Sequence, residues 1–212
     1  SLSGGYNVAI GTQSLTSNTT GEQNIAIGYS ALSCVASGIQ NVAVGSRALE
    51  KNTASNNVSV GKSSLQDNTT GAANTALGTC SLCANTTGNN NTGRSALISN
   101  TTASNNTAVG TSALTANTTG SYNIAIGQQA VSSNTTGIYN IGVGYFALKS
   151  EATGNGNTAM GHASLEDSNG GYCNSAYGYG SGRNITTGDY NTALGANSLN
   201  ANTTASNNTA VG

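Results

Sequence analysis

The chain has 212 residues and a formal net charge of −1 at pH 7, and only 6% of its residues are charged, whereas soluble domains average about 25%. This balance excludes the basic surface that nucleic acids or anionic lipids require. The sequence also lacks an apolar run of the roughly 18 residues that a membrane span needs. We therefore expect neither a nucleic-acid partner nor membrane insertion.

A glycine recurs along the whole chain, and ten of the twelve intervals in this series are 17 residues long. The two shorter intervals correspond to one residue missing from the turn 52–54 and to two residues missing between Thr92 and Gly93. The series consists of Gly11, Gly28, Gly45, Gly61, Gly78, Gly93, Gly110, Gly127, Gly144, Gly161, Gly178, Gly195 and Gly212.

A repeat of this length is one supersecondary unit that buries its apolar face only by stacking on its neighbours. We predict that residues 1–212 form a single all-β domain, a parallel β-solenoid (β-roll or β-helix) of about twelve coils. Because the repeat stays in consensus up to Gly212, we expect the domain to be a segment of a longer fibre. We number the positions of each coil from its glycine, phase 0, to phase 16.

The first predicted element of a coil is a short strand at phases 3 and 4, soon after the glycine. Phase 3 is Ala or Ser and phase 4 is Leu in most coils, as in Leu15, Leu32 and Leu114, while Gly182 interrupts the series. Each buried Leu contributes roughly 1.5–3 kcal/mol, so this column predicts a thin but continuous core.

The next predicted element is a corner at phases 7 to 10, where Asn-Thr-Thr-Gly recurs, as in 18–21 and 68–71. Asn and Gly tolerate a positive φ, which favours a turn. Charged residues fall at phases 1, 2, 5, 6, 7 and 11, and we therefore predict that these phases face solvent. These residues are Glu22, Arg47, Glu50, Lys51, Lys62, Asp67, Arg94, Lys149, Glu151, Glu166, Asp167, Arg183 and Asp189.

The last predicted element is a strand at phases 14 to 16, as in Ile25-Ala26-Ile27 and Ile124-Ala125-Ile126. Its period-2 alternation places the branched residues on one face and the small residues on the other. We expect the branched pair to face the leucines. The outward alanine columns, such as Ala26, Ala108 and Ala125, would then form the seam between chains.

Phase 13 is Asn in every coil. A stacked column of Asn can pass amide hydrogen bonds from coil to coil, so we predict a structural ladder, the alternative being a row that binds a ligand. The ladder includes Asn24, Asn41, Asn106, Asn123, Asn140 and Asn191.

The titratable residues suggest no catalytic, cofactor or metal site, and we expect no enzyme. Cys34 and Cys173 lie whole coils from any other cysteine, beyond disulfide reach. The Cys80–Cys83 spacing is that of a redox pair or half a zinc site, or these cysteines simply fill repeat positions. His162 precedes Glu166 and Asp167, but no nucleophile motif accompanies them.

The segments 106–114, Asn-Thr-Ala-Val-Gly-Thr-Ser-Ala-Leu, and 123–127, Asn-Ile-Ala-Ile-Gly, resemble the repeats of long bacterial and phage surface fibres. Such repeats lie upstream of an endosialidase-type chaperone domain. The core Asn-x-Ala-x-Gly is also similar to the head repeat of YadA-like trimeric autotransporter adhesins. This resemblance implies a left-handed parallel β-roll assembled as a homotrimer, at a cell surface or on a virion tail.

We therefore expect an extracellular fibre shaft or adhesive head that attaches to a host-cell glycan or protein receptor. Departures from the consensus are the best candidates for contact residues, because aromatic residues and Arg are typical of binding hot spots. The candidate contact residues are Tyr145, Phe146, Tyr172, Tyr177, Tyr179 and Arg183.

Two other functions remain open. Ranks of Thr at phases 8 and 9 are similar to those of ice-binding solenoids, although these ranks lie in a predicted turn. Asn-x-Ser/Thr sequons would suit a glycosylated filament. They occur at Asn18, Asn57, Asn68, Asn85, Asn90, Asn100, Asn105, Asn117, Asn134, Asn184, Asn202 and Asn207.

Overall fold

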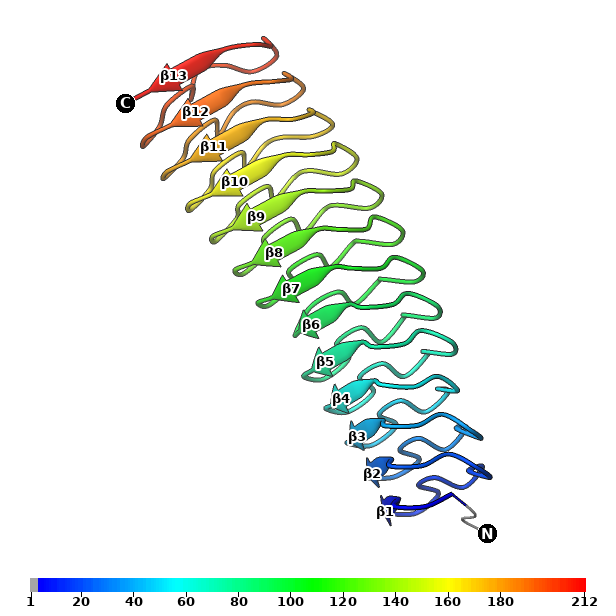
Figure 1. Cartoon of the computed structure of the whole chain (residues 1–212). Coiled ribbons are helices and arrows are strands. Elements are labelled where there is room, and N and C mark those ends of the chain that lie inside the picture. Colours follow the sequence, from blue (N-terminus) through cyan, green and yellow to red (C-terminus); the bar gives the residue numbers. More distant parts are fainter. Residues whose placement is uncertain (1–3) are drawn as a thin grey trace. The chain divides into compact units, whose positions relative to one another are not determined.

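The computed structural model describes residues 4–212, and every regular element in that range is a three-residue β-strand (Figure 1). The predicted all-β parallel solenoid of 17-residue coils is confirmed, with one strand in each coil. The strands are β1 (Val8–Ile10), β2 (Ile25–Ile27), β3 (Val42–Val44), β4 (Val58–Val60), β5 (Thr75–Leu77), β6 (Thr92–Arg94), β7 (Thr107–Val109), β8 (Ile124–Ile126), β9 (Ile141–Val143), β10 (Thr158–Met160), β11 (Ser175–Tyr177), β12 (Thr192–Leu194) and β13 (Thr209–Val211).

The chain divides into two compact units, one ending at Asn105 and one beginning at Asn106. In the first unit β1 to β6 pair in chain order, all parallel, and in the second β7 to β13 do the same. Partners are 17 residues apart, as in Ile124↔Ile141. The pair Val42↔Val58 is 16 apart, which confirms the one-residue deletion in the turn 52–54.

The two faces of each strand are the reverse of those expected. In β2 to β12 the alanines point into the coil and are completely buried, whereas the branched residues point outward: Ile124 and Ile126 are 37% and 42% exposed, and Ala125 between them is 0% exposed. At the inward position of the strand the interior is too narrow for a branched side chain. Even at Gly142, the inward position of β9, an added Cβ would lie 2.6 Å from Val131 Cγ2. The alanine columns therefore cannot form a seam between chains.

The predicted second strand at phases 3 and 4 is wrong. These residues form a tight turn in which phases 2 and 4 are left-handed, as at Arg47 (φ 59°) and Leu49 (φ 51°). The backbone still bonds between coils, because Leu32 N donates to Ala48 O at 3.1 Å. The column itself is buried as expected, with 0% exposure at Leu32, Leu49, Leu65, Leu82, Leu97, Leu114, Leu148 and Leu165.

The missing leucine at Gly182 is compensated within its own coil. Ile185 stands at phase 7, where most coils have Asn, and its side chain is 1% exposed. A Cβ added to Gly182 would lie 3.0 Å from Leu165 Cδ2 and 3.1 Å from Ile185 Cδ1. Ile185 therefore fills the volume that Leu occupies elsewhere.

Phase 0 needs glycine for two reasons. Gly28 has φ 131°, which L side chains rarely adopt, and a Cβ there would lie 2.6 Å from Gly45 O in the next coil. The corner Asn18–Gly21, by contrast, contains no described residue with a positive φ, contrary to expectation. Gly21 is needed there for space alone, because its Cβ would lie 2.4 Å from Asn18 Oδ1.

Gly93 does not belong to the phase 0 series. It lies inside β6, opposite Ala76, and so occupies the inward position of a strand. Ser95 takes the glycine's place, since its N–H donates to Leu77 O as Gly78 N–H donates to Val60 O. The two missing residues therefore fall after the strand. Arg94 is consequently an exposed strand residue and not a corner residue.

Candidate contact surface

In each unit the outward side chains of the strands, at phases 14 and 16, form a surface that we call the strand face. It is mainly apolar, and in the second unit phase 16 carries an exposed large side chain in β8 and in each strand from β10 to β13. The large exposed apolar residues of this face are Val8, Ile10, Ile25, Val60 and Leu77 in the first unit, and Ile124, Ile126, Met160, Tyr177, Leu194 and Val211 in the second.

An aromatic row follows the strand face at phase 1 of the second unit. Tyr145 and His162 stack with ring centroids 5.2 Å apart, and His162 and Tyr179 stack at 5.0 Å. All three side chains are exposed. The stacking follows directly from the repeat, since phase 1 residues of successive coils lie one strand spacing apart, about 4.8 Å. We call these residues the phase 1 row.

A second aromatic row precedes the strand face at phase 12. Tyr122 and Tyr139 stack at 5.1 Å and are 51% and 57% exposed. Cys173, a free thiol, and Tyr190 occupy the same phase and are also exposed. We call these four residues the phase 12 row.

The structure brings only some of the candidate contact residues together. Phe146 stacks on Tyr145 with centroids 3.8 Å apart, and Lys149 Nζ lies 4.2 Å from the Phe146 centroid. Tyr177 belongs to the strand face, and Tyr179 to the phase 1 row. His162 completes the row as a ring between two tyrosines, a role that its neighbours in the sequence, Glu166 and Asp167, do not indicate.

Two candidate contact residues lie outside these rows. Tyr172 is 44% exposed at phase 11, and its N–H donates to Asp189 Oδ1 at 2.8 Å. Arg183, at phase 5, pairs with Glu166 Oε2 at 2.8 Å, and the Glu166 side chain is only 10% exposed. The prediction that phase 5 faces solvent is therefore wrong for Glu166.

The asparagine column at phase 13 lies inside the coil. The oxygen and the nitrogen of each side-chain amide both form hydrogen bonds with neighbouring coils. Asn41 N donates to Asn24 Oδ1 at 3.0 Å, and Asn41 Nδ2 donates to Ala54 O at 2.9 Å. In the second unit Asn140 bonds in the same way to Asn123 Oδ1 and to Gly154 O. The column thus links backbone to backbone. Asn24, Asn41, Asn106, Asn123 and Asn140 are 0% exposed and Asn191 is 1% exposed.

A second buried polar column runs through phase 7, which the charge pattern had assigned to solvent. Asn68 Nδ2 donates to Asn52 Oδ1 of the preceding coil at 2.7 Å and to Gly71 O of its own corner. Asn134 bonds in the same way to Asn117 Oδ1 and Gly137 O. The Asn of each Asn-Thr-Thr-Gly corner therefore faces inward, because the corner's own carbonyl needs its amide.

Glu151 occupies this column as a completely buried carboxylate. Its Oε1 accepts from Gly154 N at 2.6 Å and from Gly170 N at 2.8 Å, and its Oε2 accepts from Ser168 Oγ at 2.7 Å. Buried carboxylates persist where hydrogen bonds replace the lost water. Two backbone N–H groups and a hydroxyl do so here, and the prediction that Glu151 is solvated is wrong.

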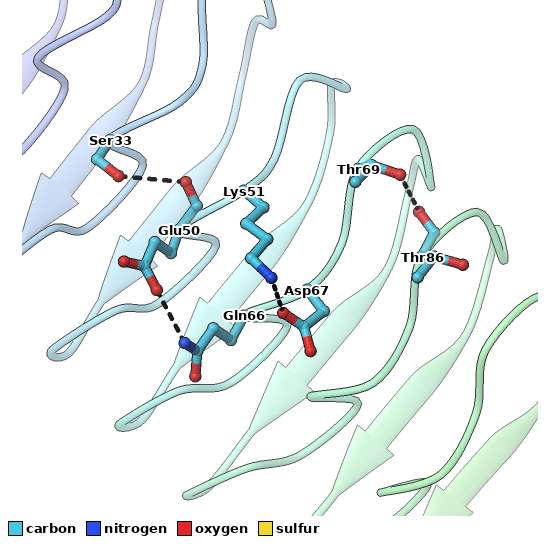
Figure 2. Close-up of polar contacts among 7 residues, drawn as sticks. All are labelled: Ser33, Glu50, Lys51, Gln66, Asp67, Thr69 and Thr86. Carbon is cyan, nitrogen blue, oxygen red and sulfur yellow. Dashed lines mark hydrogen bonds and ion pairs between the residues drawn. The ribbon is translucent and has the colours of Figure 1, made fainter.

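The charged residues of the first unit, in contrast, lie on the surface (Figure 2). Lys51 Nζ pairs with Asp67 Oδ1 at 2.7 Å, and their side chains are 56% and 45% exposed. The hydrogen bond to Asp67, followed by its charge, raises the pKa of Lys51 above its usual value. In the neighbouring contact Gln66 Nε2 donates to Glu50 Oε2 at 2.8 Å. Exposed pairs of this kind contribute little to stability.

Two of the four cysteines form a disulfide, and the other two are free. Cys80 and Cys83 form a disulfide across the left-handed turn at Leu82, while Cys34 and Cys173 are free and exposed. Among residues 4–212 no group of three or more His, Cys, Asp or Glu could hold a metal ion. The same residues form no detectable pocket.

Most sequons are structurally inaccessible. Asn18, Asn68, Asn85, Asn100, Asn117 and Asn134 belong to the buried phase 7 column, and Asn57 belongs to the phase 13 column. The exposed sequon residues are Asn90, Asn105 and Asn207, all at phase 12, and Asn184. The asparagines of the repeat corners thus form hydrogen bonds inside the coil.

Comparison of this chain with protein-family models, with curated proteins and with solved structures gave no match. None of the described residues belongs to a helix that is long and apolar enough to cross a membrane.

Proposed function

We propose that this chain is the shaft or adhesive head of an extracellular or virion fibre, assembled as a homotrimer and attached to a glycan or protein receptor of a host cell. The strand face is the observation that carries this proposal. It leaves apolar side chains exposed or half-buried at phases 14 and 16 of most coils, and exposed apolar surface of this kind is typical of association sites. The seam between chains thus belongs to the branched residues and not to the alanines.

Repetition supports a long parallel contact. Each coil presents its phase 14 and phase 16 side chains at the same place, so copies arranged side by side around an axis parallel to the stack bury the strand face along their length. Such cyclic assemblies are the common form of homo-oligomers. The number three rests on the resemblance of the repeat to trimeric surface fibres.

The thin core supports assembly as well. Each coil orders 17 residues around one Leu and several small side chains, and ordering a residue costs about 1–2 kcal/mol of conformational entropy. Burial of the strand face between copies would add apolar contacts that a single chain lacks. Receptor contacts would be made on the flanks, by exposed residues such as Tyr172 and Arg183.

A substitution on the strand face tests the proposal. Ile126→Lys places a charge on an outward side chain that is already 42% exposed, so the coil itself should keep its fold. We expect the parent protein to have the mass of a trimer by light scattering and the variant to have that of a monomer, with unchanged far-ultraviolet circular dichroism. Thr136→Lys, at an exposed corner of the same unit, is the control. A monodisperse, stable parent monomer would refute the proposal.

Ice binding is a second candidate, which one observation favours. Phase 14 is an outward position, so Thr107, Thr158 and Thr192 lie on the strand face, where an ice-binding rank would be. The phase 8 rank is less suitable, since its hydroxyls bond to the next coil, as Thr69 Oγ1 does to Thr86 O at 2.9 Å (Figure 2). Thermal hysteresis in solution would favour ice binding over a fibre.

A further inference from the structure

We infer that the two aromatic rows meet each other across the contact between neighbouring copies, the phase 1 row of one copy against the phase 12 row of the next. The inference rests on the proposed parallel assembly and specifies which residues make its edges. It assigns Tyr145 and Tyr179 to the contact with a second copy of this chain and not to the contact with a receptor.

The first step is where the rows lie. Exposure alternates along the chain from phase 12: Tyr122 is 51% exposed, Asn123 is 0%, Ile124 is 37%, Ala125 is 0% and Ile126 is 42%. The phase 12 row is therefore exposed at the left-handed bend before each strand, separated from the strand face by one buried Asn. The phase 1 row lies at its other border, just after the glycine that ends the strand. The two rows thus flank one apolar surface.

The second step is symmetry. When copies stand side by side around an axis parallel to their stacks, the border that follows the strand in one copy meets the border that precedes it in the next. An antiparallel twofold pair would instead match each border with itself. A parallel assembly thus places the phase 1 row of one copy against the phase 12 row of the next. A stacked or edge-to-face aromatic pair contributes about 0.5–1.5 kcal/mol beyond its buried area.

The third step is the level of the residues along the stack. A coil rises about 4.8 Å, and Tyr139 precedes Tyr145 by only six residues, as Cys173 precedes Tyr179. These pairs therefore differ in level by about 2 Å. Tyr139 of one copy faces Tyr145 of the next as an aromatic pair, Gly156 faces His162, and Cys173 faces Tyr179.

The charges of the first unit also differ in sign between the two borders, at levels about one to two coils apart. Arg47 and Lys62 are exposed at phases 2 and 1, after the strand, whereas Glu22 is exposed at phase 11, before it. A border that carries cations would meet one that carries an anion. A contact between two like borders would instead place cations against cations.

The free thiol of Cys173 provides a direct test. In a Cys34→Ser background, Tyr179→Cys adds a thiol to the phase 1 row, and a short bismaleimide adds one thiol at each of its two alkenes. Asp167→Cys, at an exposed corner, is the matched control, and His162→Cys is a second position in the row. Light scattering on each variant before crosslinking reports whether it is assembled.

We expect about tenfold more crosslinked product with Tyr179→Cys than with Asp167→Cys, because contact raises the effective thiol concentration far above that in free solution. An assembled protein whose two variants crosslink equally would overturn the inference while leaving the proposed assembly intact. Crosslinking through Cys173 alone would overturn it too, because like borders would then meet. A monomeric parent would refute the proposed assembly, and the inference with it.

Discussion

At the scale of single residues, the interior of the solenoid is occupied by small and polar side chains as much as by leucine. The strand alanines are buried because the coil is narrow, and the two Asn columns are buried because they bond to the backbone of adjacent coils. A buried amide that lacks a partner costs about 1–3 kcal/mol. The columns therefore hold the register between coils, which a purely apolar interior would not specify.

Glu151 gives the clearest residue-level prediction. Glu151→Ala leaves the N–H groups of Gly154 and Gly170 and the Ser168 hydroxyl without this acceptor inside the coil. We expect a loss of about 2–4 kcal/mol in the free energy of unfolding, measured by urea denaturation. Glu151→Asn, which restores the side chain of the other coils, should lose less. Asp167→Ala, on the surface, should change little, and equal losses at 151 and 167 would contradict the burial of Glu151.

At the scale of the element, the coil is closed by left-handed residues rather than by the Asn-Thr-Thr-Gly corner. Phases 2, 4 and 12 have φ near 50–60° in non-glycine residues, as at Gln40 (φ 59°), Arg47 (φ 59°) and Leu49 (φ 51°). Each such residue is strained by about 1–3 kcal/mol. The hydrogen bonds between coils and the burial of the leucines offset this strain, so a single coil would not fold by itself.

Gly28→Ala tests the role of the phase 0 glycine. The substitution forces a side chain into φ 131° and places Cβ 2.6 Å from Gly45 O. We expect it to lower the free energy of unfolding by about 2 kcal/mol or more, which a chemical denaturation curve would show. Gly5→Ala is the control, since nothing lies within 4 Å of its added Cβ. Tolerance of Ala at position 28 would mean that the period does not depend on backbone geometry.

At the scale of the whole molecule, the strand face and its two aromatic borders are the surface that a partner would cover. Few charged residues surround this exposed apolar surface, since only 6% of the residues in the chain are charged. In the proposed assembly the same surface becomes interior, and the charged residues at phase 6 remain in water.

Assembly of this kind makes stability depend on concentration. Association of folded copies stabilises them by mass action, so the melting temperature of the parent protein should rise with protein concentration. Differential scanning calorimetry at several concentrations would measure this. The Ile126→Lys variant should melt at a lower temperature that does not vary with concentration. A parent whose melting temperature is equally constant would be a folded unit that needs no partner.

The sequence by itself determined the solenoid, its 17-residue period and the deletion in the turn 52–54, because glycine, leucine and asparagine columns are set by local backbone geometry and repeat strictly. It also located the buried leucines and the phase 13 ladder. It did not determine which face of each strand is inside. Alternation of Ile and Ala is the same pattern for either face, and only the width of the coil, with Leu opposite Ala, decides between them. The tertiary structure likewise decided the burial of Glu151, the place of Gly93 in β6 and the stacking of His162 between Tyr145 and Tyr179. These features depend on what lies one coil away, and residues 17 apart become neighbours only when the chain has folded.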